Sequence, residues 1–232
     1  MIRSVESDDD YARLIALREA IDPLTATTVA DVRAFRRQAE SSLYVLAAEL
    51  DGIAWLERRG FQLFDRQERV VLDLSNGAGV QTIHPFELSD LAHRRDLAPA
   101  LYRLLVEGVS DVPGALAEEV PSFKAWLDYQ QVPSRKPEFL VTALEHGEPV
   151  AYSQLHVYPR VGYHGFTTVA RHARGRGLAR AVKLELIRRA RDAGLERLIT
   201  QSNEANAAMR TLNESLGYRA APASLTFAGL IV

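Results

Sequence analysis

The stretch from Thr167 to Arg180 limits the possible folds more than any other part of the chain. An apolar strand at 162–170 leads into a turn with two glycines and two arginines at 174–177, and an amphipathic helix at 178–193 follows directly. Glycine adopts backbone conformations that other residues avoid, and it lets the backbone approach a ligand closely. The first N–H groups of a helix lack partners within it and lie at the positive end of its dipole. The stretch therefore predicts a strand–turn–helix unit that binds an anion such as pyrophosphate.

Two well-known phosphate loops fit this stretch less well. The P-loop requires a Lys followed by Ser or Thr, and this stretch has no such pair. The dinucleotide-binding fingerprint needs a third glycine where this chain has Arg180. A solvated helix start without a ligand is the simplest alternative. An RNA contact is disfavoured because no aromatic residues alternate with the arginines.

The composition is that of an ordinary globular protein and excludes several functional classes. Of the 232 residues, 47% are hydrophobic, so the chain can bury a sizeable core. The 28 basic and 30 acidic residues give a net charge of -2, which does not fit a dedicated nucleic-acid-binding protein. The absence of cysteine excludes disulfides, thiolate metal sites and a cysteine nucleophile, and we expect no metal site. The N-terminus lacks a signal peptide and no apolar run approaches about 20 residues, so we expect a cytoplasmic protein without membrane contact.

Hydrophobic periodicity predicts alternating strands and helices in the second half of the chain. His146-Gly147-Glu148 is typical of a tight hairpin. The strands are expected at 80–83, 139–144, 149–157, 162–170, 198–201 and 225–230, and the helices at 97–109, 122–129, 178–193 and 205–215. In the helix at 178–193 we expect Val182, Leu186 and Ala190 to be buried, and Arg180, Lys183, Arg188 and Arg191 to face water.

The first half of the chain resembles the second at two points. The strand and turn at 47–52 parallel those at 142–147, and the helix end at 56–61 parallels that at 213–218. The expected elements of this half are strands at 2–5, 43–50 and 70–74 and helices at 11–21, 28–39 and 53–59. The first copy lacks the central strands and the glycine turn of the second. We therefore interpret the chain as a duplicated domain, with a shortened copy at 1–76 and a complete copy at 80–232.

The central motif resembles the coenzyme loop of the GNAT superfamily of acyl-CoA N-acyltransferases. That loop reads Gln/Arg-x-x-Gly-x-Gly/Ala between a strand and a helix, and Arg174-x-x-Gly177-x-Ala179 matches it. Further marks of the superfamily are an Asn near a strand end, an Asn at a helix start and a helix that closes with Gly and an aromatic residue. Asn203, Asn206 and the pair Gly217-Tyr218 match these marks. The layout most resembles tandem members of the superfamily, among them the mycothiol synthase group.

The resemblance implies a role for each part of the loop. The backbone of the strand end at Thr168 and Val169 would pair with the pantetheine arm of acetyl-CoA and polarise the thioester carbonyl, as an oxyanion-hole donor does. Asn206 would contact the coenzyme and Asn203 would line the site. The pyrophosphate would be held by Arg174, Gly175, Arg176, Gly177, Leu178, Ala179 and Arg180.

The resemblance also implies direct attack of a neutral amine on the thioester, which requires a base and an acid. Many members place a Tyr four residues before the closing Gly as the acid, whereas this chain has Asn213 there. His164, on the strand that leads to Val169, is a candidate base because a histidine titrates near neutral pH. Glu204 is a second candidate.

Each of these side chains also has a structural interpretation. A structural role on its strand is the favoured interpretation of His164, and Asn203 is a natural cap for the helix that follows. Phe123 and Trp126 are core candidates, or they form a wall of the acceptor pocket. Glu118 and Glu119 are a solvated acidic run, or they attract a cationic amine.

Together these features predict an α/β (α+β-like) fold, with a GNAT-like mixed, mainly antiparallel sheet and helices on both faces. The expected activity is transfer of an acetyl group from acetyl-CoA to a primary amine of a small molecule. A non-catalytic acyl-CoA-binding module and a protein-lysine acetyltransferase are the alternatives. The truncated GNAT-like remnant at 1–76 would pack against the second domain, shape the acceptor pocket or form a homodimer contact.

Overall fold

The computed structural model describes residues 53, 57–58, 60–75, 85–112 and 120–228. The elements expected before residue 53, the strand expected at 80–83, and the acidic pair Glu118 and Glu119 lie outside these residues. The chain divides into two compact units, of which one comprises residues 68–221 and the other residues 1–67 with 222–232. The candidate site belongs to the unit 68–221, which is described below.

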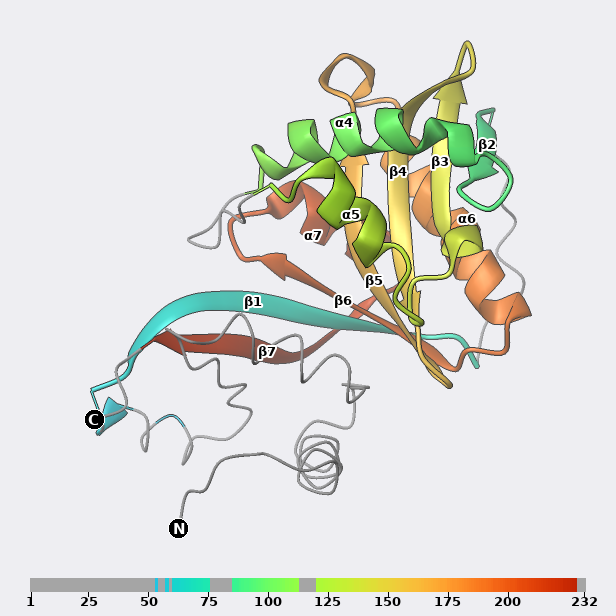
Figure 1. The fold of residues 1–232 in the computed structure, drawn as a ribbon. Coiled ribbons are helices and arrows are strands. Elements are labelled where there is room, and N and C mark those ends of the chain that lie inside the picture. The colour runs from blue at the N-terminus through green and yellow to red at the C-terminus, as the bar shows by residue number, and fades with distance from the viewer. Residues whose placement is uncertain (1–52, 54–56, 59, 76–84, 113–119, 229–232) are drawn as a thin grey trace. The chain divides into compact units, whose positions relative to one another are not determined.

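Seven strands form a mixed sheet in the order β2-β3-β4-β5-β6-β1-β7 (Figure 1). The pairs β2–β3, β3–β4 and β4–β5 are antiparallel, and β5 and β6 are parallel. The mainly antiparallel sheet confirms the predicted fold class. The strand bounds are β1 Gln62–Asp73, β2 Glu87–Asp90, β3 Leu140–Glu145, β4 Glu148–Val157, β5 Val161–Val169, β6 Arg197–Asn203 and β7 Arg219–Ala228.

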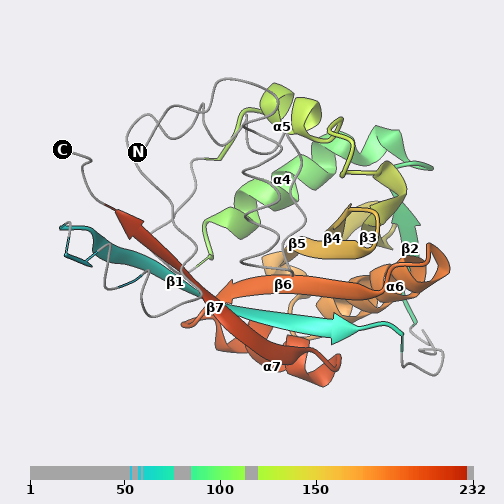
Figure 2. The same cartoon turned by 90° about the horizontal axis from the view of Figure 1, so that it is seen from below.

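Helices cover both faces of the sheet, as expected. Helices α4 (Ala98–Val109) and α5 (Phe123–Tyr129) lie over one face, and α6 (Leu178–Asp192) and α7 (Ala207–Ser215) lie over the other (Figure 2). Short 3-10 helices precede α4, β3 and α6, at Arg95–Leu97, Pro137–Phe139 and Arg171–Ala173. Each of the four α-helices begins and ends within two residues of its predicted bounds.

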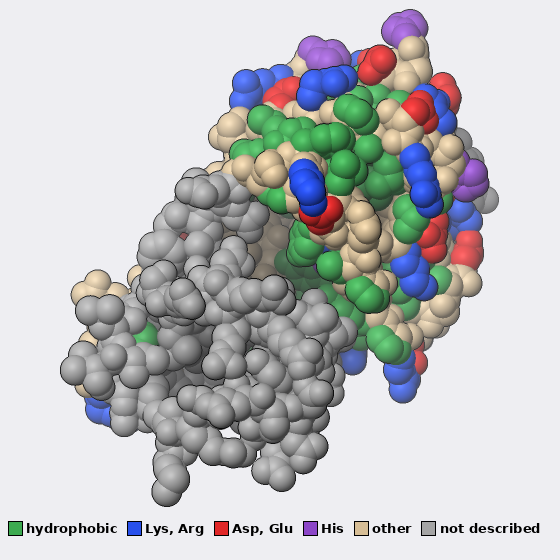
Figure 3. All heavy atoms as spheres, viewed as in Figure 1, with side chains coloured by type: hydrophobic (Ala, Val, Ile, Leu, Met, Phe, Trp, Pro, Cys, Tyr) green, Lys and Arg blue, Asp and Glu red, His purple; other side chains and the backbone are tan. Residues whose placement is uncertain are grey.

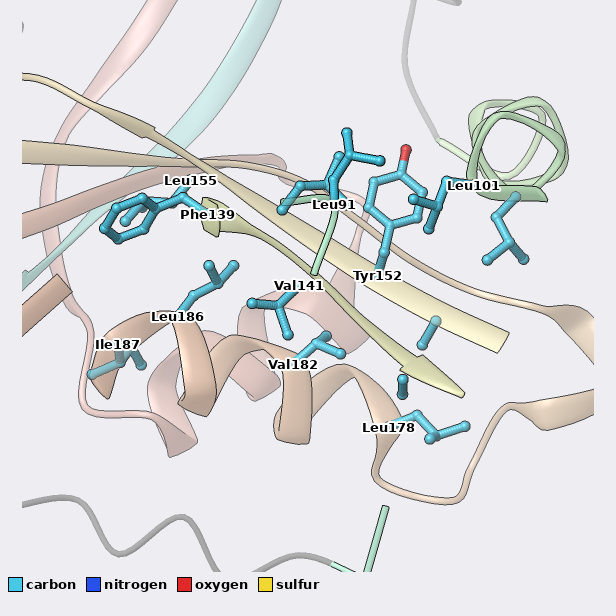
Figure 4. Close-up of a cluster of buried hydrophobic side chains, with 14 of the residues drawn as sticks. Leu91, Leu101, Phe139, Val141, Tyr152, Leu155, Leu178, Val182, Leu186 and Ile187 are labelled. Atoms are coloured by element: carbon cyan, nitrogen blue, oxygen red, sulfur yellow. The ribbon is translucent and has the colours of Figure 1, made fainter. Parts of the chain in front are cut away.

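The hydrophobic core fills the space on both sides of the sheet (Figure 4). Tyr152 of β4 meets Leu101 of α4 on one face, and Val141 of β3 lies near Val182 and Leu186 of α6 on the other. The predicted buried residues of α6, Val182, Leu186 and Ala190, are all fully buried. Burial of one Val or Leu side chain contributes about 1.5–3 kcal/mol, so this face holds α6 on the sheet.

Left-handed backbone positions occur where the sequence predicts turns. His146 and Gly147 join β3 to β4 with φ angles of 52° and 82°. Two successive positive φ angles are typical of the type I′ turn, and they confirm the predicted hairpin. Gly60 and Gly217, the ends of the two parallel helix segments, have φ angles of 80° and 90°. The N–H groups of both glycines make the same contact, because each donates to the carbonyl of the residue three positions earlier.

Three strands, the edge strands β2 and β7 and the strand β1 beside β7, differ from the predicted ones. Strand β2 was not predicted, and β1 and β7 begin earlier than the sequence indicated. The sequence of β2, Glu-Leu-Ser-Asp, has no alternating apolar pattern, and its strand conformation comes from pairing with β3. Polar edge strands of this kind are recognisable only once their partner is known.

The prediction that Lys183 faces water is wrong. Lys183 is fully buried on α6, and its Nζ finds no hydrogen-bond partner among the described residues. Its ammonium group lies 5.7 Å from the centre of the Tyr218 ring, close enough for a cation–π contact. Lys183 follows Val182 directly, and the buried face of α6 is wide enough to include both. Burial lowers the pKa of Lys183 to about 7.

We predict that Lys183→Met stabilises the protein most at low pH. The unfolded chain keeps the ordinary lysine pKa of 10.5 and binds more protons than the folded chain above pH 7. The free energy of unfolding of the wild type should therefore rise by about 1.4 kcal/mol per pH unit in this window, relative to the variant. Urea denaturation from about pH 6 to pH 9 measures the difference. Lys124→Met, at an exposed lysine of α5, is the control and should show no such trend. Parallel pH curves for wild type and Lys183→Met would contradict the prediction.

Candidate active site

The glycine turn leaves the N-terminus of α6 open. Gly175 and Gly177 have φ angles of 74° and 84°, which only glycine adopts without strain. Gly177 is the N-cap of α6, and no side chain caps this end. A Cβ atom added at either glycine would meet nothing within 4 Å. The turn thus offers a bare helix N-terminus with space above it, which fits an anionic group.

Buried side chains fix the position of this helix N-terminus. The Leu178 side chain, at the first position of α6, is 1% exposed and belongs to the core. Ala173, which precedes the turn, is fully buried. The Ala181 N–H already donates to the Gly177 carbonyl over 3.0 Å. The N–H groups of residues 178–180 therefore remain for a ligand, because no earlier turn of helix exists to accept them.

The three arginines of the motif contact protein groups in this structure. The Arg174 guanidinium donates to the Asp111 carboxylate over 2.5 Å and to the Val169 carbonyl over 3.1 Å. Arg176 forms an ion pair with Glu145 at the end of β3. Arg180 donates to Ser215 Oγ over 2.8 Å. Exposed ion pairs of this kind contribute little to stability, so a phosphate could take the place of the carboxylates.

Two acidic residues that the sequence analysis did not single out hold the turn in place. The Arg171 N–H donates to Glu107 of α4 over 2.6 Å, and the Arg171 guanidinium donates to Asp111 over 2.9 Å. Hydrogen bonds from Arg171 and then Arg174 lower the pKa of Asp111, so it stays ionised. The carboxylate therefore links α4 to the turn. No sequence signal marks this role, because the partners lie 60 or more residues apart.

Near its end, strand β5 is paired on one side only among the described residues. Its pairing with β4 extends to Val169, whereas its pairing with β6 covers only Val161–Tyr163. The Ala170 N–H donates to the Val150 carbonyl of β4. Successive N–H groups of an extended strand point to opposite sides, so the Val169 N–H points away from β4. This arrangement leaves a backbone edge of β5 beside the glycine turn.

The side chain of Thr168 does not share this edge. It is 7% exposed and lies against α4 at Gly108. A Cβ added at Gly108 would come within 2.3 Å of Thr168 Oγ1, so glycine is needed for the close approach of α4 to β5. Any part of Thr168 in ligand binding would therefore be played by its backbone.

His164 lies at the centre of a buried hydrogen-bond network. It is 1% exposed, its Nε2 is 2.9 Å from Ser153 Oγ, and its Nδ1 is 3.0 Å from Tyr218 Oη. Ser153 Oγ is also 2.7 Å from Thr167 Oγ1. Burial, followed by the nearby charge of Lys183, lowers the pKa of His164 well below its usual value. With both ring nitrogens engaged, His164 could exchange a proton with a substrate only through Ser153 and Thr167.

The two asparagines of the motif stabilise the start of α7. Asn206 is its N-cap, and its side chain accepts a hydrogen bond from the Met209 N–H over 3.2 Å. The Asn203 side chain accepts from the Ala205 N–H over 2.9 Å, which closes the turn before the helix. Capping is thus performed by Asn206, three residues after the position considered from the sequence. Glu204 lies exposed between them, and its role as a base stays a prediction.

The position where many GNAT members have a tyrosine is buried here. Asn213 of α7 is 1% exposed, and neither its amide oxygen nor its amide nitrogen finds a partner among the described residues. Tyr218 belongs to the core and is 2% exposed. Trp126 is also buried, at 3%, and Phe123 packs against the core, as expected.

The described residues hold no group of three or more His, Cys, Asp or Glu side chains that could bind a metal ion. None of the helices in the same part of the chain is both long and apolar enough to cross a bilayer.

Comparison with known proteins points to one family. The GNAT acetyltransferase family matches residues 99–218, which include the turn, both asparagines and the closing glycine. A comparison with curated proteins found no match to the chain.

The solved structures that are similar to this chain include three GNAT proteins. A GCN5-related N-acetyltransferase from Sphaerobacter thermophilus matches 87% of this chain with a TM-score of 0.64 and 18% identity, and the match covers 65% of that protein. A tandem GNAT protein from the clavulanic acid biosynthesis pathway matches 86% of the chain with a TM-score of 0.62 and 16% identity, over 67% of its own length. A GCN5-related N-acetyltransferase from Kribbella flavida matches 87% with a TM-score of 0.56 and 14% identity, over 73% of its length.

The chain thus spans about two thirds of the length of the first two structures, and at these identities the similarity shows the fold. The match to the family covers more than half of the chain, including the glycine turn at the start of α6. The chain therefore belongs to the GNAT family of acetyltransferases.

Proposed function

We propose that this protein transfers an acetyl group from acetyl-CoA to a primary amine of a small molecule. The observation that carries the proposal is the uncapped, glycine-lined N-terminus of α6 beside the unpaired edge of β5. A pyrophosphate on the helix end and an extended pantetheine arm along the strand edge require these two features side by side. They meet within nine residues of chain, from Val169 to Leu178.

The Val169 N–H is the proposed donor to the thioester carbonyl. Its direction, away from β4, supports this role. The amine nitrogen would form a bond to the carbonyl carbon while the bond from that carbon to sulfur breaks. One backbone donor of this kind is worth about 100- to 1000-fold in rate. The Gly175 and Gly177 backbone and the start of α6 would hold the pyrophosphate, with Arg174, Arg176 and Arg180 nearby.

The proton of the amine would leave through the network around His164. Thr167, Ser153 and His164 form a continuous path of 2.7 Å and 2.9 Å contacts that begins two residues before Val169. His164 is neutral at physiological pH because burial lowers its pKa, so one ring nitrogen can accept a proton, and the same burial makes His164 a weak base. Glu204 is the alternative base.

A non-catalytic acyl-CoA-binding module is the second candidate. The observation that favours it is Asn213, which stands at the position of the acid in many members and has no exposed polar atom to offer. Under this interpretation the coenzyme binds at the same turn but no acceptor is acetylated.

We predict that Gly177→Glu abolishes coenzyme binding. The new carboxylate would stand at the open N-terminus of α6, where it repels pyrophosphate. Isothermal titration of coenzyme A and acetyl-CoA into the full chain measures the affinity. Gly194→Glu is the matched control, since Gly194 also has a positive φ, of 75°, with nothing within 4 Å, but follows the opposite end of α6. Both variants carry the same backbone strain and charge, and only Gly177→Glu should lose binding. Equal affinity of the two variants for the coenzyme would show that the turn at 174–177 does not bind the pyrophosphate.

We predict that Ser153→Ala lowers the rate of acetyl transfer about 100-fold without changing the affinity for acetyl-CoA. The substitution breaks the path between Thr167 and His164. Release of coenzyme thiol over a panel of small primary amines measures turnover. Tyr218→Phe removes the other hydroxyl that contacts His164 and leaves the path intact, so it should stay within about twofold of the wild type. Equal losses in both variants would assign His164 a structural role. Coenzyme binding without thiol release from any amine would favour the non-catalytic module.

A further inference from the structure

A positively charged side chain lies within an aromatic cluster between α5 and β4, outside the site described above. The Arg135 guanidinium carbon is 3.3 Å from the centre of the Tyr129 ring. Its Nη1 donates to the Gln154 amide oxygen over 3.1 Å. Its Nε is buried and finds no partner in the described part of the chain. In the flipped orientation of its amide, the Gln130 oxygen also accepts from Nη1 over 3.2 Å, and the Tyr129 hydroxyl is a further partner. All of these partners are neutral.

No carboxylate of the described residues pairs with Arg135. Burial lowers the pKa of Arg135, and the groups that oppose this shift are the hydroxyls of Tyr129, Tyr152 and Tyr158. Arginine stays charged even so, and this half-buried charge has no counterion among the described residues. Arg189, another half-buried arginine, shows how this chain satisfies such a charge, because it contacts both Asp90 and Glu185. The comparison indicates that Arg135 lacks an anion that a ligand could provide.

The neighbours of Arg135 do not supply negative charge. The His156 ring packs edge-on against the rings of Tyr129 and Tyr163, at centroid distances of 6.4 Å and 5.8 Å. Burial, and then the charge of Arg135, lower the pKa of His156 to about 3, so its imidazole is neutral. The cluster therefore consists of neutral aromatic rings around the positive charge of Arg135.

The cluster is open to the outside and shares strands β4 and β5 with the proposed reaction centre. Tyr129 is 51% exposed, and Figure 3 views the face of the molecule on which α4 and α5 lie. Successive side chains of a strand point to opposite faces, so Gln154 points to the face of α5, whereas Ser153 points with Thr167 and His164 to the other face. The cluster therefore lies on the face of the sheet that α4 and α5 cover, and not on the face of the Thr167–Ser153 path. A ligand of several atoms could contact Arg135 with one end and reach toward β5 with the other.

We propose that Arg135, with the Tyr129 ring and the Gln154 amide, binds a carboxylate of the acceptor, so that the preferred substrate is an amine that carries an acid group. This inference rests on the proposed function. A guanidinium has the planar, forked geometry that matches a carboxylate. A phosphate dianion fits less well, because the cluster provides a single cation.

Matched pairs of amines test the inference. The probes are 4-aminobutyrate with 4-aminobutanamide, and 6-aminohexanoate with 6-aminohexanamide, which differ only in the charge of one end. Thiol release from acetyl-CoA gives kcat/KM for each probe with the full chain. We expect the acid of at least one pair to exceed its amide about tenfold or more. Arg135→Gln should remove this preference by lowering the value for the acid while that for the amide changes less than about twofold.

Arg160→Gln is the matched control, since Arg160 is an exposed arginine whose partner is Glu196. It should keep the preference of the wild type. Arg135→Lys keeps the charge without the planar fork and should recover only part of the preference. Equal kcat/KM for acids and amides in the wild type, or a preference that survives in Arg135→Gln, would overturn the inference and leave the proposed function intact.

Binding without turnover separates this inference from the proposed function. The same four probes are titrated calorimetrically into the wild type and Arg135→Gln, in the presence and absence of coenzyme A. Binding of the acids that is lost in Arg135→Gln, in a protein that neither binds coenzyme A nor releases thiol, would support the anion site and refute the proposed function. Absence of any difference between acids and amides in these titrations would refute the anion site.

Discussion

The packing of α6 against β3, β4 and β5 is the interaction on which the site depends. Leu178, Val182, Leu186 and Ile187 are almost fully buried along this face, and each contributes about 2 kcal/mol of hydrophobic stabilisation. Because Leu178 is the first residue of the helix, burial of its side chain fixes where the helix begins. The open N–H groups above it are thereby held at one place relative to the end of β5. The proposed phosphate site consists of backbone groups. It needs this rigidity because it has no long side chain that could adjust.

The charged side chains around the site differ from those farther inside the protein in how they are neutralised. The arginines of the turn contact carboxylates at the surface, where ion pairs are weak and exchangeable. Asp111 and Glu107 hold the turn against α4. In the proposed complex, phosphate would replace carboxylates as the partner of the arginines. Lys183, which is fully buried, and Arg135, which is half-buried, are positive groups that no described carboxylate neutralises. Burial lowers the pKa of Lys183, whereas Arg135 keeps its charge, for which we propose an anionic ligand.

Only the local features of the site could be predicted from the sequence. Strand β5, the glycine turn and α6 could be predicted because they are local: periodicity, left-handed glycines and a bare helix start depend on residues close together in the chain. The hairpin at His146-Gly147 and the buried Val182 and Leu186 are of the same kind. The burial of Lys183 could not be predicted, since periodicity does not show how wide the buried face is. The network of Ser153, His164 and Tyr218 joins β4, β5 and the residue before β7, and only the packing of these segments brings the side chains together.

The sequence by itself therefore determined the type of fold, the family and the position of the glycine turn. These properties follow from short-range patterns, which physical chemistry ties to particular backbone conformations. The tertiary structure alone decided which carboxylates hold the arginines, which nitrogens of His164 are engaged, and that Arg135 meets the Tyr129 ring and Gln154. Each of these facts is a contact between side chains on different elements. Such contacts depend on strand register and helix placement, which the burial of the whole core sets at once.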